Sequence, residues 1–208
     1  MEACAGTHHW ARILQSHGYI VKLIPPQFVK PYVKSNKNDA NDAEAMSRPN
    51  MRFVSIKTTE QQDIQAIHRV RSGLMTDRTA LGNRIRGLVS EYGLVAPMTL
   101  NALKQAIPGW LEEADNGSSD RFRSLLHGLW EDLIRLTQRI GDLDKAIILF
   151  AQSNTMTKRL QQLRGVTPLV ATALVATVGT GQQYAKGKQM AAAIGLTPRQ
   201  QGSVVGYQ

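Results

Sequence analysis

Residues 126–150 read LHGLWEDLIRLTQRIGDLDKAIILF, and apolar side chains recur in this stretch at alternating steps of three and four. This spacing is typical of a coiled coil, and it predicts one long α-helix with a single apolar seam. The seam positions are Leu126, Leu129, Leu133, Leu136, Ile140, Leu143, Ile147 and Phe150. We therefore expect a fold that is mostly α, with long coiled-coil helices in its middle part.

An earlier stretch carries a second seam at the same spacing, but two of its positions are arginines. The positions are Ile67, Arg71, Leu74, Arg78, Leu81, Ile85, Leu88 and Tyr92. The arginines can extend past the seam or meet acids of the other predicted helix. Those acids are Glu131, Asp132, Asp142 and Asp144. The two helices can pair as an antiparallel hairpin within one chain or across a dimer, and an ordinary helical bundle core is the alternative.

Helix-breaking residues separate the two seams. They are Pro97, Pro108, Gly109 and the run NGSS at 116–119. Proline removes a backbone donor and glycine adds backbone freedom, so these residues predict a connection that interrupts the helices.

The first part of the chain combines a helix, a strand and three acids. HHWARILQSHG at 8–18 predicts a helix closed by Gly18, and YIVKLI at 19–24 predicts a strand. So few strands indicate a small, incomplete α/β part, and we expect residues 1–57 to be poorly stable alone. Asp39 and Asp42 lie three apart in a short predicted helix, on one face, where they are a candidate half-site for a hard divalent metal. Glu2 is a third acid, although acids also favour helix starts for dipole reasons alone.

A second motif, LQQLRGVTPLVATALVATVG, occupies residues 160–179. It predicts a helix to Arg164, a tight turn, and a second helix that begins at Pro168, which is the shape of a helix-hairpin-helix. Such hairpins hold phosphate with backbone N–H groups, although Thr167 replaces the usual second glycine, and a simple buried helix is the alternative. The candidate DNA contacts of the whole chain are Lys34, Lys37, Arg164, Gly165, Thr167, Lys186, Lys188 and Arg199.

The positive net charge of the chain favours a nucleic-acid partner. The formal net charge is +9, and no acid occurs between residues 154 and 208. Binding to phosphates by such basic segments depends strongly on salt, while a generically basic protein is the bland alternative. The single cysteine excludes an internal disulfide, and no apolar run approaches the roughly 18 residues of a membrane span. We expect a cytoplasmic protein with no membrane partner.

Several long stretches together resemble one family. They are MEACAGTHHWARIL, LIPPQFVKPYVKSNKNDANDAEA, RPNMRFV, EQQDIQAIHRVR, RLQQLRGVTPLVATALVATVG and QMAAAIGLTPRQQGS. The chain resembles the DEDD transposases of the insertion-sequence one-ten family, relatives of the pilin-gene inverting recombinase. The resemblance implies an RNase H-like (RuvC-like) domain whose four acids bind Mg²⁺, and Glu2, Asp39 and Asp42 match the second, third and fourth. It also implies a serine nucleophile from a later domain, a structured guide RNA from the element, and assembly as a homo-oligomer.

The resemblance also sets expectations about extent and activity. The first acid has no counterpart, and Ser203 is not the family's serine, so we expect a fragment truncated at both ends and inactive or incomplete. The expected parts are a partial RNase H-like DEDD segment at 1–57, a helical coiled-coil spacer at 58–153 and a partial C-terminal DNA-binding domain at 154–208. The expected function is that of a transposase, which breaks and rejoins DNA. The alternative is a non-catalytic nucleic-acid-binding or oligomerisation remnant that modulates the full-length transposase.

Overall fold

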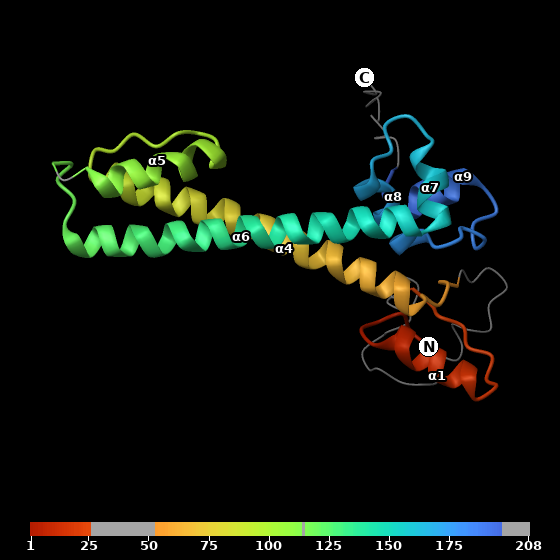
Figure 1. The fold of residues 1–208 in the computed structure, drawn as a ribbon. Helices are drawn as coiled ribbons and strands as arrows, with labels where there is room; N and C mark the ends of the chain where they lie inside the picture. The colour runs from red at the N-terminus through yellow and green to blue at the C-terminus, as the bar shows by residue number, and fades with distance from the viewer. Residues whose placement is uncertain (26–52, 114, 197–208) are drawn as a thin grey trace, which may run out of the picture. The chain divides into compact units, whose positions relative to one another are not determined.

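The computed structural model describes residues 1–25, 53–113 and 115–196, and this part of the chain is mostly helical, as predicted (Figure 1). The helices are α1 (Thr7–Ser16), α4 (Thr59–Ser90), α5 (Leu100–Glu112), α6 (Asp120–Ser153), α7 (Thr155–Gln161), α8 (Pro168–Val178) and α9 (Gly187–Ala193). The chain forms two compact units. Unit 1 contains Met1–Gln62 and Leu174–Gln208, and unit 2 contains Asp63–Ala173. Across the described ranges, no helix is both long and apolar enough to cross a membrane.

Helix α6 confirms the long helix predicted from the apolar seam. It begins where the Ser119 side chain accepts a hydrogen bond from the backbone N–H of Phe122, with Asp120 in the first turn. Every second seam residue is buried, at intervals of seven positions in the chain, while the seam residues between them are partly exposed. The buried set is Leu126, Leu133, Ile140 and Ile147.

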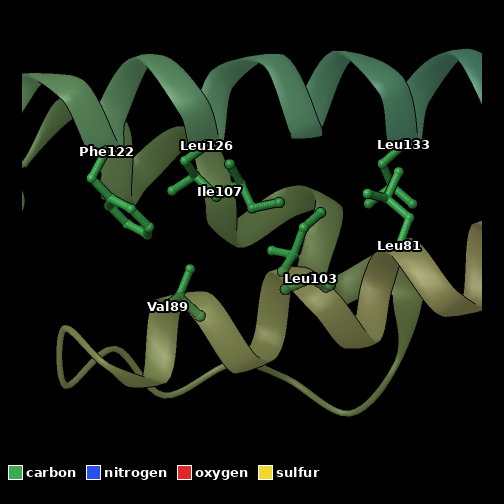
Figure 2. Packing of buried hydrophobic residues seen from close by; sticks show 8 residues of the cluster. Leu81, Val89, Leu103, Ile107, Phe122, Leu126 and Leu133 are labelled. Atoms are coloured by element: carbon green, nitrogen blue, oxygen red, sulfur yellow. The ribbon is translucent and has the colours of Figure 1, made fainter.

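The core of unit 2 forms where α4, α5 and α6 meet. In Figure 1, α4 and α6 run in opposite directions, so the two seams pair as a hairpin within one chain. Figure 2 shows Leu81 of α4 and Leu133 of α6 pointing toward one another. Ile107 of α5 lies beside Leu126, and α5 thereby fills the space between the two long helices at one end of the hairpin. The buried core members are Leu81, Ile85, Val89, Leu103, Ile107, Phe122, Leu126 and Leu133.

The predicted connection between the seams is wrong in part, because it contains helix α5, Leu100–Glu112. Pro108 lies inside this helix and cannot donate to the carbonyl of Lys104, four residues earlier. The indole Nε1–H of Trp130, on α6, donates to that carbonyl at 3.1 Å instead. Thr99 caps the start of α5 by accepting from the N–H of Ala102. A side chain from a neighbouring helix therefore supplies the hydrogen bond that the proline removes.

The first part of unit 1 contains α1 as predicted, and Gly18 closes it with φ of 84°. The strand predicted at 19–24 is much shorter, because only Leu23 and Ile24 pair with other segments of the described chain. Ile24 forms a parallel bridge with Glu2, and Leu23 forms an antiparallel bridge with Val54. Both partners, Glu2 and Val54, lie far from Leu23 and Ile24 in the sequence, so the run at 19–24 alone predicts too long a strand.

Candidate metal and nucleic-acid sites

Glu2 lies in the short backbone ladder of unit 1. The Ile24 N–H donates to the Met1 carbonyl at 2.9 Å, and the Ala3 N–H donates to the Ile24 carbonyl at 2.7 Å. The terminal ammonium of Met1 also donates to the Lys22 carbonyl at 3.0 Å. Since both neighbours of Glu2 are tied to the segment at 22–24, the backbone that carries this half-buried carboxylate has a defined position.

The other two predicted metal ligands, Asp39 and Asp42, lie outside the described residues, as do Lys34 and Lys37. Within the described residues, no group of three or more His, Cys, Asp or Glu side chains could hold a metal ion. A carboxylate is the ligand type that Mg²⁺ prefers, so Glu2 fits one position of such a site. The described residues therefore supply one candidate ligand.

The turn between α7 and α8 brings together three of the predicted DNA contacts, Arg164, Gly165 and Thr167. All three are exposed, and Gly165 has φ of 86°, a left-handed conformation that favours glycine. Helix α8 begins at Pro168, as predicted, but α7 ends at Gln161, before the predicted end at Arg164. The Thr167 hydroxyl accepts from the N–H of Val170 at 3.4 Å, so Thr167 caps α8. The turn thus presents one cation, Arg164, beside the start of α8, which the Thr167 side chain already caps.

A hydrogen bond from α4 holds the start of α8 within unit 2. His68 Nε2 lies 2.9 Å from Thr172 Oγ1, and Thr172 is fully buried. The Thr172 hydroxyl donates its one hydrogen to the Pro168 carbonyl at 2.8 Å. In the contact with His68, the His68 N–H is therefore the donor and the Thr172 oxygen accepts. Burial, and then the neighbouring Arg71 cation, lower the pKa of His68. The α7–α8 turn is therefore followed by a helix whose buried Thr172 is hydrogen-bonded to α4.

The remaining described candidates, Lys186 and Lys188, belong to unit 1. Lys186 immediately precedes α9 and Lys188 lies in its first turn, and both are exposed. The backbone beside them is ordered by the Gln189 side chain, which accepts from the N–H of Ala185 at 3.1 Å. Arg199 lies outside the described residues.

Unit 1 also contains a basic hollow that the sequence patterns did not indicate. We use this name for the hollow of about 480 Å³ lined by Arg12, Gln15, Val21, Lys22 and residues 53–58. Arg12 Nη1 donates to the Lys57 carbonyl at 2.6 Å, and the Lys22 ammonium lies 4.9 Å from the centroid of the Phe53 ring. The three cations lie at positions 12, 22 and 57, so no local motif could have found them.

His8 lies near two of the cations that line the basic hollow, Lys57 and Arg12. Its Nδ1 accepts from the backbone N–H of Lys57 at 3.1 Å. Burial, followed by the Lys57 and Arg12 cations, lowers the pKa of His8. Burial is the larger cause, and the two neighbouring cations add to it, so both favour the neutral form of His8.

Comparisons with known proteins agree across most of the chain. Residues 1–94 match a family profile described as a DEDD transposase, and residues 157–204 match one described as the transposase IS116/IS110/IS902 family. The transposase for insertion sequence element IS1111A of Coxiella burnetii is 43% identical over 207 residues, covering 98% of this chain and 57% of the relative. A probable family 20 transposase of Pseudomonas aeruginosa is 42% identical over 205 residues, covering 96% of this chain and 61% of the relative.

The transposase for insertion sequence element IS1328 of Yersinia enterocolitica is more distant. It is 34% identical over 206 residues, covering 96% of this chain and 60% of the relative. The chain thus spans less than two thirds of the length of these curated relatives.

Proposed function

This chain belongs to the IS116/IS110/IS902 family of transposases, and we propose that it takes part in metal-dependent DNA breakage and rejoining during movement of an insertion sequence. In this proposal Glu2, Asp39 and Asp42 hold a divalent ion, Mg²⁺. When bound, the ion stabilises negative charge on the phosphodiester. The observation that supports the proposal is the backbone ladder that fixes Glu2 between Met1, Ala3 and Ile24.

The proposal assigns DNA contact to basic residues, most of them in the later part of the chain. Arg164 supplies charge at the α7–α8 turn, while Gly165 and Thr167 shape its backbone. Lys186 and Lys188 supply charge at α9, and Lys34, Lys37 and Arg199 complete the predicted set. Residues 154–208 contain no acid to oppose these contacts. Phosphate contacts of this kind position the protein without reading sequence.

The proposal also covers the division of the chain into parts, its location in the cell and its partners. It places a partial RNase H-like segment at 1–57, a helical spacer at 58–153 and a DNA-binding part at 154–208 of a cytoplasmic protein. A structured RNA from the element guides it, and a homo-oligomer assembles through the long helices. Support for the spacer comes from α4 and α6, which hold a core of their own with α5. The same core favours the second candidate function, a non-catalytic module that modulates the full-length transposase.

The metal part of the proposal is tested with Mn²⁺ as a paramagnetic substitute for Mg²⁺. We expect Glu2→Gln to weaken Mn²⁺ binding about tenfold, because the amide keeps the shape of the side chain but loses the anionic oxygen donor. Glu91→Gln is the matched control, since it removes one exposed acid elsewhere in the chain. Equal Mn²⁺ affinities of Glu2→Gln and the unaltered chain would remove Glu2 from the site.

One set of reactions distinguishes the catalytic function from the non-catalytic module. The purified chain is titrated with salt on duplex DNA and on structured RNA, with and without Mg²⁺, and cleavage is followed in the same tubes. Mg²⁺-dependent cleavage that Glu2→Gln abolishes would support the catalytic function. Salt-sensitive binding without cleavage would support the non-catalytic module. Binding that Arg164→Gln leaves unchanged would contradict the assigned turn contact.

A further inference from the structure

We propose that the basic hollow of unit 1 binds a backbone phosphate of a single nucleic-acid strand, held by Arg12, Lys22 and Lys57. None of these residues is among the DNA contacts proposed above. The inference deepens the proposed function, on which its choice of a nucleic-acid ligand rests. Its test uses no divalent metal, so it can fail while the metal site stands.

The lining of the hollow is chemically one-sided. Three segments of unit 1 each contribute one cation, and no Asp or Glu is among the described lining residues. A concave surface lined by one sign of charge concentrates its field and attracts the opposite charge. Guanidinium and ammonium groups are the side chains that proteins use for phosphate, the first by fork geometry and the second as a point charge. The hollow therefore fits an anion with several oxygens.

Two of the cations are held in place before any ligand arrives. The bond from Arg12 to the Lys57 carbonyl, at 2.6 Å, uses one of the five N–H donors of the guanidinium. The Phe53 ring attracts the Lys22 ammonium through its π face at 4.9 Å. Side chains that are already ordered lose less conformational entropy on binding. The arrangement is thus preorganised for an anionic group.

Size and the surrounding dipoles favour a nucleotide over a free ion. A hollow of about 480 Å³ lies in the range of sites for small organic ligands, so it has room for a sugar beside the phosphate. Gln15, Ser55 and Thr58 add neutral polar groups to the lining. Thr58 also caps the positive end of α4, accepting from the N–H of Gln61 at 3.1 Å, and this helix end adds to the positive potential.

The test measures binding of a fluorescent thymidine oligonucleotide to the full chain, in EDTA, across a salt titration. We expect Lys22→Gln and Arg12→Gln each to lower the slope of log affinity against log salt by about 0.7, the value of one phosphate contact on a single strand. Arg84→Gln and Arg139→Gln are the charge-matched controls, since both are exposed cations of unit 2. Equal losses in the two pairs would overturn the site, because net charge alone would then explain them.

Two further measurements guard against an unfolded variant or a different ligand. Lys22 is exposed, so Lys22→Gln should keep the helical circular dichroism, and Arg12→Lys should restore part of the lost slope. In the unaltered chain, the oligonucleotide should raise the pKa of His8 in a ring-proton titration, since a bound phosphate offsets the Arg12 and Lys57 charges. An unchanged His8 titration would overturn the site, and competition by inorganic phosphate at equal concentration would overturn its assignment to a nucleic-acid strand.

Discussion

Arg71 and Arg78 occupy seam positions seven residues apart in α4, yet their surroundings differ. Arg71 Nε donates to Asp144 Oδ1 on α6 at 2.5 Å, which is one of the pairings that the sequence left open. Arg78 Nε is buried and has no hydrogen-bond partner among the described residues. The same residue type therefore stabilises the hairpin at one position and opposes it at the other.

Methionine substitutions at these two positions should have opposite effects on the free energy of unfolding. Arg78→Met should raise it by about 1 kcal/mol, because it removes a buried donor without a partner and keeps an apolar stem. Arg71→Met should lower it by about 0.5 kcal/mol, a small loss because the Asp144 side chain is 41% exposed. Urea unfolding followed by circular dichroism measures both, and changes of the same sign would contradict the assignment.

His68 should make stability depend on pH. Its pKa is lowered in the folded chain, whereas the unfolded chain keeps the ordinary value of 6.5. Above pH 6.5 both states are neutral at this residue and its contribution is fully present. As the pH falls below 6.5, the unfolded state takes up the proton first, so stability declines until the folded His68 is also protonated.

The His68 effect is measured from urea midpoints between pH 8 and pH 5. We expect His68→Gln to reduce the loss of stability at acid pH, because the amide can still donate to Thr172 but does not titrate. A smaller dependence should remain in the variant, since the pKa of His8 is lowered as well. Identical pH profiles of variant and unaltered chain would contradict this role.

At the scale of elements, Pro108 and Trp130 should be energetically coupled. Trp130→Phe should lower the free energy of unfolding by more than 1 kcal/mol, because it leaves the Lys104 carbonyl without its donor and loses packing. In a chain that already carries Pro108→Ala, the same change should cost about 1 kcal/mol less, since the new backbone N–H can donate to Lys104. A double-mutant cycle measures the coupling, and additive effects would contradict it.

The elements that the sequence predicted well are those set by local pattern. Helix α6 followed from its seam, α1 from Gly18, and the start of α8 from Pro168. Helix α5 was missed because Pro108 indicates a break, and the residue that compensates for it, Trp130, lies on another helix. The strand at 19–24 was overestimated because its extent depends on segments outside it.

The candidate site residues also differ in whether the sequence alone could indicate them. The resemblance indicated Glu2, and the local motif indicated the turn at Gly165, which the structure forms. Arg12, Lys22 and Lys57 escaped notice because only tertiary structure brings them to one hollow. Asp39, Asp42, Lys34, Lys37 and Arg199 lie outside the described residues, and their roles stay predictions.

At the scale of the whole molecule, the two units should differ in resistance to hydrogen exchange. Unit 2 has a buried core from three helices, whereas isolated bridges join the described segments at the start of unit 1. We expect the amides of Ile85 and Leu126 to exchange more slowly than those of Ile24 and Val54. This agrees with the low stability expected for residues 1–57. Equal protection in exchange followed by mass spectrometry would contradict it.

The division of the chain also bears on its synthesis. Unit 2 is one continuous segment, whereas unit 1 is built from residues on both sides of it. On a ribosome, Asp63–Ala173 can fold as soon as it leaves the exit tunnel, while unit 1 is complete only after Leu174–Gln208 has been translated. During that interval Glu2 and the basic hollow belong to a half-finished unit. The nascent chain would therefore complete its helical hairpin before Leu174–Gln208 joins the unit that contains Glu2 and the basic hollow.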